Sequence, residues 1–103
     1  MRFMILMMRK GSASASPDSV QYNKALQRAG VLLAVDGLFP PSTAARISYR
    51  NGKATVRDGP FAEAEEAIGG YWMIQVRSRE EAIEWAKRAP MSDDDVIEVR
   101  QVA

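Results

Sequence analysis

The chain contains no cysteine and no histidine among its 103 residues. The absence of cysteine excludes disulfides, thiolate nucleophiles, thiolate-ligated zinc and iron–sulfur clusters. The absence of histidine excludes a Ser-His-Asp triad, a histidine-ligated haem and a metal site built from two histidines and a carboxylate. Any acid–base chemistry must therefore come from Asp, Glu, Tyr or Lys, and we expect no metal site and no bound cofactor.

The sequence also lacks an excess of charge of one sign and a long apolar segment. Fourteen basic and thirteen acidic residues leave a net charge of +1, which offers no general field for nucleic acid or an anionic membrane. The longest apolar run, Phe3 to Met8, is too short to span a bilayer and does not resemble a signal peptide. We expect a cytoplasmic protein with neither nucleic-acid nor membrane partners, folded as one domain over residues 1–103.

The first third of the chain has the periodicity of a strand, a helix and a second strand. Arg2 to Arg9 carries apolar side chains on both alternating sets, which is typical of a strand covered on both faces. Ser16 and Pro17 predict the N-cap and first turn of a helix that ends at Gly30. Val31 to Val35 predicts the second strand.

Asn51-Gly52 is the strongest short hairpin signal in the sequence. It predicts that Ala45 to Arg50 pairs with Lys53 to Arg57 through a two-residue turn. That register places Ile47 opposite Val56 on one side of the hairpin.

The other side of the predicted hairpin pairs like charges, Arg46 with Arg57 and Arg50 with Lys53. Such pairs are destabilising by about 0.2–1 kcal/mol. We therefore expect this basic side to be solvated, to hold an anion, or to be balanced by the acidic residues just downstream. These are Glu63, Glu65 and Glu66.

After the hairpin, Asp58-Gly59-Pro60 predicts a capped turn leading into a short helical turn from Phe61 to Ile68, which Gly69-Gly70 ends. Tyr71 to Arg77 then alternates as a strand with one apolar and one mixed face.

A capping box at the start of the next segment, Ser78 with Glu81, predicts a second helix that Pro90 stops. Val96 to Val102 predicts the last strand, after an acidic loop.

The predicted order is β-α-β, a hairpin, a short helical turn, then β-α-β. This order is typical of an α+β fold of the ferredoxin-like kind, with two helices on one face of an antiparallel sheet. The doubly apolar first strand indicates that the other face is covered too, and the simplest cover is a second copy of the same sheet. The sequence therefore predicts a homodimer.

Four side chains are candidates for acid–base chemistry. They are Asp58, Asp36, Glu63 and Tyr71. Asp36 follows a strand at a point where a turn would place it beside the sheet cleft, and Glu63 could fold over that cleft as a general base. Each carboxylate also has a plainer role as a cap, a solvated group or an ion-pair partner.

The candidates for ligand binding are Arg46, Tyr22, Phe61 and Tyr71. Arg46 beside a carboxylate would provide an anion clamp next to a proton acceptor. The two tyrosines have an alternative role, because buried tyrosine hydroxyls usually find a structural partner.

One stretch resembles a known family. Asp58-Gly59-Pro60-Phe61-Ala62-Glu63, followed by Gly69-Gly70-Tyr71 and by Glu81-Ala82-Ile83-Glu84-Trp85-Ala86, is similar to the DGPF signature of YCII-related proteins. The resemblance covers nearly the whole chain. It implies a dimeric α+β barrel in which two ferredoxin-like sheets face each other, in agreement with the argument from the first strand.

The resemblance implies less about activity. Some YCII-related proteins use a histidine near the start of the first helix with an acidic partner, and Ser19 stands at that position here. Members of the DGPF group are often encoded beside extracytoplasmic-function sigma factors, which implies a regulatory, stress-linked role. We therefore consider three alternatives: a dimeric small-ligand-binding or regulatory protein, a cofactor-independent lyase-like or hydrolase-like enzyme acting on a small carbonyl or aromatic acid, and an interaction module without a pocket.

Overall fold

The computed structural model describes residues 1–9, 17–61 and 67–103. Within them the elements are β1 (Arg2–Arg9), α1 (Pro17–Arg28), β2 (Leu32–Gly37), the 3-10 turn η1 (Pro41–Thr43), β3 (Ala45–Arg50), β4 (Lys53–Asp58), β5 (Ala67–Gln75), α2 (Arg79–Lys87) and β6 (Val96–Gln101). Four strands form an antiparallel sheet in the order β2-β5-β1-β6, and β3 and β4 form a separate two-stranded sheet.

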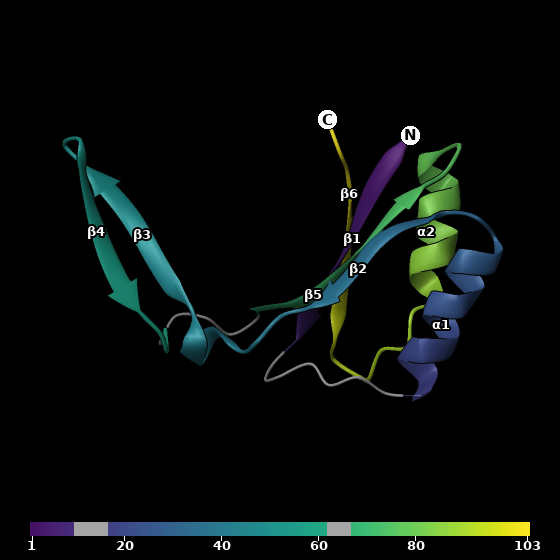
Figure 1. Ribbon diagram of the computed structural model, residues 1–103, viewed down its shortest axis with the longest axis horizontal. Helices are drawn as coiled ribbons and strands as arrows, with labels where there is room; N and C mark the ends of the chain where they lie inside the picture. The colour runs from purple at the N-terminus through teal and green to yellow at the C-terminus, as the bar shows by residue number, and fades with distance from the viewer. Residues whose placement is uncertain (10–16, 62–66) are drawn as a thin grey trace.

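Both helices lie on one face of the four-stranded sheet (Figure 1). This arrangement confirms the predicted α+β architecture, which is consistent with a ferredoxin-like fold. None of the helices in the described ranges is long and apolar enough to cross a membrane.

The core lies between the helices and the sheet. Its central members come from β1, β5 and the inner faces of α1 and α2: Phe3, Ile5, Met7, Trp72, Ile74, Tyr22, Leu26, Ala82 and Ala86. The Trp72 ring meets the Tyr22 ring edge-on, with centroids 5.1 Å apart and planes at 86°. The Trp72 indole donates to the Asn23 side-chain oxygen at 2.7 Å, so its polar atom is satisfied inside the core.

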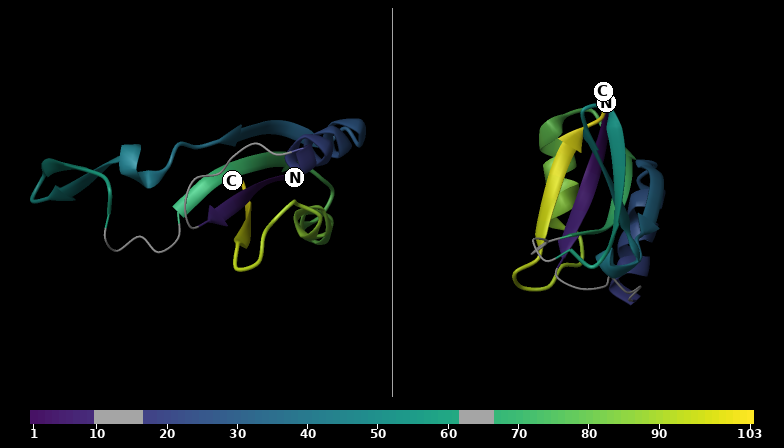
Figure 2. Two further views of the ribbon diagram at one scale, coloured as in Figure 1. Left: turned by 90° about the horizontal axis from the view of Figure 1, so that it is seen from below. Right: turned by 90° about the vertical axis from the view of Figure 1, so that its left-hand side faces the viewer.

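The opposite face of the four-stranded sheet, called the open face here, is covered by neither helix (Figure 2). Its central side chains are Met4, Leu6, Met8, Asp36, Tyr71 and Met73. Leu6 is buried, and Met4, Met8 and Met73 are half-buried. As predicted, the first strand is therefore apolar on both faces.

The β3–β4 hairpin, called the arm here, extends away from the sheet on the side opposite the helices (Figures 1 and 2). Its register is the predicted one, with Ile47 opposite Val56 and Arg46 opposite Arg57. Asn51 and Gly52 both have positive φ, 52° and 75°, as the tight hairpin turn requires. All residues of both strands are exposed.

The predicted helical turn from Phe61 to Ile68 is wrong at its end, because β5 begins at Ala67 and includes Gly69-Gly70. Gly69 is the extra residue where the β1–β5 register shifts. At Gly70 a Cβ would lie 2.9 Å from the Asp36 carbonyl oxygen, so the glycine allows two strands to approach closely. The rest of the predicted turn, including Glu63, lies outside the described residues.

Two predictions at the ends of elements differ from the structure. The second strand runs two residues further, since Asp36 and Gly37 pair with β5. Ser78 caps α2 as predicted and accepts from the Glu81 amide at 3.1 Å, but the Glu81 carboxylate accepts from the Arg77 amide. The Ser16 cap of α1 lies outside the described residues.

Candidate functional site

Asp36 and Tyr71 form a hydrogen-bonded pair on the open face. They lie opposite each other on β2 and β5, and the Tyr71 hydroxyl donates to Asp36 Oδ2 at 2.7 Å. Asp36 is exposed and Tyr71 partly so. The structure thus brings together two of the candidate acid–base residues, a carboxylate and a phenol. Both could contact a ligand bound on the open face.

The hydrogen bond to Asp36 raises the pKa of Tyr71 above its usual 10.0, with further contributions from desolvation and the Asp36 charge. All three effects favour the neutral phenol. An ionised Tyr71 would lose the hydrogen bond to Asp36, would be repelled by the carboxylate charge and would be less well hydrated than in free solution. Tyr71 is therefore a hydrogen-bond donor at neutral pH. The bond is lost only as the pH rises through the raised pKa.

Replacing Asp36 with asparagine should lower the pKa of Tyr71 toward 10.0, because the substitution removes the negative charge and the strongest acceptor. Alkaline titration followed by tyrosinate absorbance measures this change. Subtracting the titration of a Tyr71→Phe variant isolates the Tyr71 signal from that of Tyr22, whose pKa burial raises to about 12. An unchanged Tyr71 pKa in Asp36→Asn would contradict the assigned cause.

A pocket of about 420 Å³ lies where the arm joins the sheet. We call it the root pocket. Its lining is Met8, Leu38, Phe39, Pro41, Ala44, Arg46, Phe61, Ala67 and Ile68. Among the lining residues that the structure describes, Arg46 is the only charged one, so this part of the pocket combines an apolar wall with one cation. Such a composition is typical of small-ligand sites.

Phe61 is held at the root of the arm by two arginines. The Arg46 guanidinium lies 3.8 Å from the centre of the Phe61 ring and the Arg57 guanidinium 5.1 Å from it. The ring itself is buried, with 7% of its surface exposed. A cation over an aromatic face is attracted by about 0.5–2 kcal/mol, which offsets the repulsion of this cross-strand arginine pair.

The root pocket and the Asp36–Tyr71 pair share the open face. Leu38 lies two residues beyond Asp36, and Met8 lies two residues beyond Leu6, which is opposite Tyr71. Two residues along a strand span about 6.6 Å and return to the same face. The root pocket therefore begins about two residues along the strands from the Asp36–Tyr71 pair.

The remaining candidates lie elsewhere. Tyr22 is in the core on the helix side of the sheet, where its hydroxyl donates to the Trp85 carbonyl at 2.7 Å. Asp58 is exposed at the end of β4, opposite Ala45, so its side chain projects to the side of the arm away from Arg46. Glu63 lies outside the described residues.

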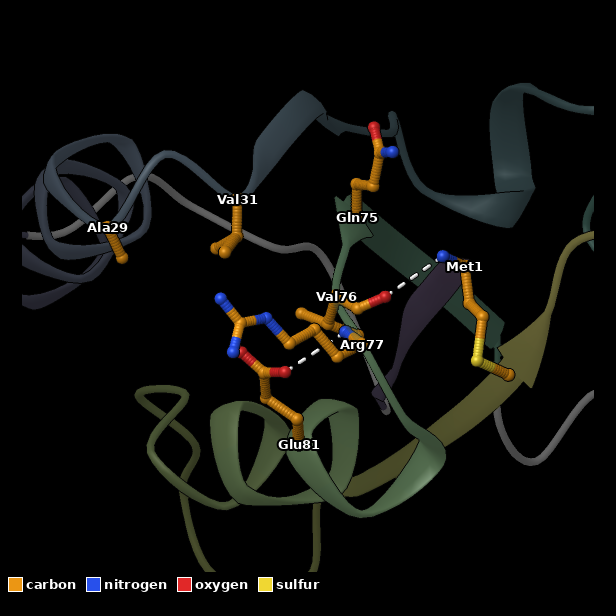
Figure 3. Close-up of a pocket in the computed structure, with 7 residues that line it drawn as sticks. All are labelled: Met1, Ala29, Val31, Gln75, Val76, Arg77 and Glu81. Atoms are coloured by element: carbon orange, nitrogen blue, oxygen red, sulfur yellow. Dashed lines mark hydrogen bonds between the residues drawn. The ribbon is translucent and has the colours of Figure 1, made fainter.

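A larger pocket of about 580 Å³ lies between the N-terminus and α2 (Figure 3). Two of its polar groups already have structural partners: the Met1 amine donates to the Val76 carbonyl at 2.9 Å, and the Glu81 carboxylate accepts from the Arg77 amide at 3.0 Å. None of the candidate residues lines it. The root pocket is therefore the better candidate despite its smaller volume.

Sequence reasoning missed the apolar half of the root pocket. Leu38 and Phe39 follow β2 and were not among the predicted site residues, yet both line the pocket and Phe39 is 87% exposed. A large aromatic side chain directly before Pro40-Pro41 was the available signal. Among residues 1–9, 17–61 and 67–103 there is no cluster of three acidic side chains placed to hold a metal ion.

Comparison with known proteins agrees with the resemblance in the sequence. The family model described as YCII-related domain matches residues 1–103. The chain is 39% identical over 59 residues to Uncharacterized protein R00369 of Rhizobium meliloti (strain 1021), which covers 57% of this chain and 48% of that protein. The match spans about half the length of this curated relative. Because the family model covers the whole sequence, the chain belongs to the YCII-related family.

Proposed function

We propose that this protein binds a small ligand with an anionic group and an apolar body in the root pocket, and that it works as a homodimer. The observation that carries the proposal is the Arg46 guanidinium, stacked over buried Phe61 in a pocket whose other described lining residues are apolar. The neighbouring Asp36–Tyr71 pair adds a donor and an acceptor on the same face.

The geometry at Arg46 suits a carboxylate. The Arg46 guanidinium lies against the Phe61 ring, and a guanidinium recognises a carboxylate through N–H groups that lie in its own plane. The exposed Phe39 ring and Ile68 would contact the apolar body of the ligand. The ligand class is therefore a small aromatic or aliphatic acid.

The homodimer in this proposal is supported by the open face. Met4, Met8 and Met73 are half-buried in a single chain and border the Asp36–Tyr71 pair. Apolar surface of this kind is unfavourable in water and is typical of a face that packs on another. Two such sheets facing each other would shield the root pocket and the pair from bulk water.

A regulatory role linked to an extracytoplasmic-function sigma factor also belongs to this proposal. It rests on the resemblance to the DGPF group alone. Binding of a small acid between two chains is the event that such a role would use as its signal.

Benzoate, the simplest aromatic acid, tests the site. Titration followed by heteronuclear NMR should shift the amide signals of Ala44 and Ile68 in the wild type. The Arg46→Ala variant should bind benzoate about tenfold or more weakly, because a charge-assisted hydrogen bond contributes about 1.5–3 kcal/mol.

The matched control is Arg50→Ala, on the same basic side of the arm but next to the turn and outside the pocket lining. It should bind benzoate like the wild type. Shifts scattered over the chain, or equal weakening by both variants, would contradict the root pocket as the site.

One observation favours an enzyme as the second candidate function. The Asp36 carboxylate accepts a hydrogen bond from a neutral phenol, which places a general base beside a proton donor. A cofactor-independent reaction on a small carbonyl or aromatic acid would use both. Exchange of the methyl protons of pyruvate in deuterated water distinguishes a binding protein from an enzyme. A protein that only binds the acid leaves the exchange rate unchanged. Catalysis by Asp36 accelerates the exchange in the wild type but not in Asp36→Asn.

A further inference from the structure

We propose that the outer edge of β6 pairs with the same edge of a second copy of this chain. The two four-stranded sheets then join across a two-fold axis into one antiparallel sheet. Backbone hydrogen bonds and two pairs of opposite charges make the contact. This inference goes beyond the proposed function, because it requires neither the root pocket nor a contact between open faces.

β6 is an edge strand without the usual protection. It is the last strand of the four-stranded sheet, and no strand in the described ranges pairs with its outer side. Its six residues, Val96–Gln101, include neither proline nor lysine, and their register with β1 has no bulge. Such features protect exposed edges from pairing with another chain. β2, at the opposite edge, does carry a register shift, between Leu32 and Ala34.

The backbone of β6 restricts how two copies can pair. The Val102 amide donates to the Arg2 carbonyl at 2.9 Å, so the even-numbered residues of β6 direct their backbone groups toward β1. Because these groups alternate in direction along a strand, those of Ile97, Val99 and Gln101 point outward. Two copies must place their outward groups opposite each other. The two-fold axis therefore passes through a single residue, which faces its own copy.

Charge selects the residue on the axis. Glu98 and Arg100 lie on the same face of β6. An axis through either of them would place two like charges directly opposite, which is unfavourable. An axis through Val99 places Glu98 of each copy opposite Arg100 of the other. These are non-hydrogen-bonded positions, where opposed side chains are closest, so the strand is complementary to itself in this register.

Glu98 and Arg100 can make this contact while keeping the one they already have. Within one chain, Arg100 Nε lies 3.9 Å from Glu98 Oε2, and the two side chains are 72% and 55% exposed. An ion pair as exposed as this one contributes little by itself. A carboxylate has two acceptor oxygens and a guanidinium has five N–H donors. Each group can therefore bind a neighbour on its own strand and another on the opposite strand.

A groove at the same edge supports the contact. It has a volume of about 420 Å³ and lies between α2 and β6, where its apolar lining residues are Ile83, Ala86, Ile97 and Val99. A two-fold axis perpendicular to the sheet places the helices of both copies on the same face, with the two grooves side by side. Pairing thus covers the outer side of each groove, and the apolar surface removed from water stabilises the assembly.

Introduced cysteines test the contact and its register, because the chain has no cysteine of its own. A Glu98→Cys variant is mixed with an Arg100→Cys variant under oxidising conditions, and disulfide-linked dimers are measured by non-reducing electrophoresis and mass spectrometry. In the proposed register the two cysteines are directly opposed, with Cα atoms about 4.5 Å apart. The second pair of positions keeps its native glutamate and arginine.

Each variant alone provides a control for register. Two copies of the same variant place their cysteines on a diagonal, about 7–8 Å apart, which is beyond the reach of a disulfide. We therefore expect the mixture to form at least about tenfold more linked dimer than either variant alone. A Glu80→Cys variant, exposed on α2, is mixed with Arg100→Cys to measure linkage by random collision. Circular dichroism verifies that all three variants fold.

Each outcome bears on a separate part of the inference. If the Glu98→Cys and Arg100→Cys mixture gives no more linked dimer than the Glu80→Cys control, the edge contact is overturned. Efficient linkage of Glu98→Cys alone, or of Arg100→Cys alone, would place the axis at that residue and overturn the register through Val99. Benzoate binding to the root pocket is measured separately, so neither result depends on the proposed function.

Discussion

Replacement of Trp72 with alanine should lower the free energy of unfolding by about 3–5 kcal/mol. The side chain is 2% exposed at the centre of the core. It packs edge-on against Tyr22 and satisfies the Asn23 side chain. Alanine leaves both a cavity and a half-buried amide oxygen without its donor. Urea unfolding followed by circular dichroism measures the loss.

A Trp72→Phe variant separates these two effects. Phenylalanine retains most of the ring volume but lacks the indole donor, so the remaining loss should be about 1–3 kcal/mol, the cost of an unsatisfied buried acceptor. If the alanine and phenylalanine variants unfold at the same urea concentration, the packing of the Trp72 ring does not contribute to the free energy of unfolding as expected.

The second large effect is expected at the root of the arm. Replacing Gly59 with alanine should destabilise the fold by about 1–3 kcal/mol, because its Cβ would collide with the carbonyl oxygen of Pro41. The same Cβ would lie 3.1 Å from the Pro41 carbonyl carbon and 3.3 Å from that of Ser42. All of these are backbone atoms, which cannot move aside as a flexible side chain can. Thermal unfolding measures the change.

Gly37→Ala is the matched control for Gly59. A Cβ at Gly37 meets only the Gly69 carbonyl oxygen, at an ordinary 3.9 Å. We expect its effect on stability to stay within about 0.5 kcal/mol, as for a substitution that disturbs no special feature. Equal losses of stability in the two variants would show that the close approach of η1 does not require glycine at position 59.

The sequence predicted best where the structure depends on neighbouring residues. The turn at Asn51-Gly52 sets the register of the arm, because both residues must adopt positive φ and this fixes which side chains face each other. The cap at Ser78 likewise needs only the amide three residues later. The predicted helical turn is wrong at its described end, because Ala67 and Ile68 pair with β1 and Gly70 lies close to β2, and both contacts join segments distant in sequence.

The candidate site was predicted as residues but not as an arrangement. Asp36 and Tyr71 were named separately, and their hydrogen bond depends on the pairing of β2 with β5, across 35 residues. Phe61 was named without its arginine neighbours, since the ring meets Arg46 and Arg57 only after the chain returns from the arm. Tyr22 was named with them, yet its helix places it on the opposite side of the sheet.

By itself the sequence determined the family, the α+β architecture, the doubly apolar first strand and the register of the arm, because each follows from local turn chemistry or from periodicity along one element. Only the tertiary structure decided that the arm leaves the sheet, that Arg46 stacks over Phe61 in a pocket, and that Asp36 meets Tyr71. These features arise from strand pairing between distant segments, which periodicity along a single element does not specify.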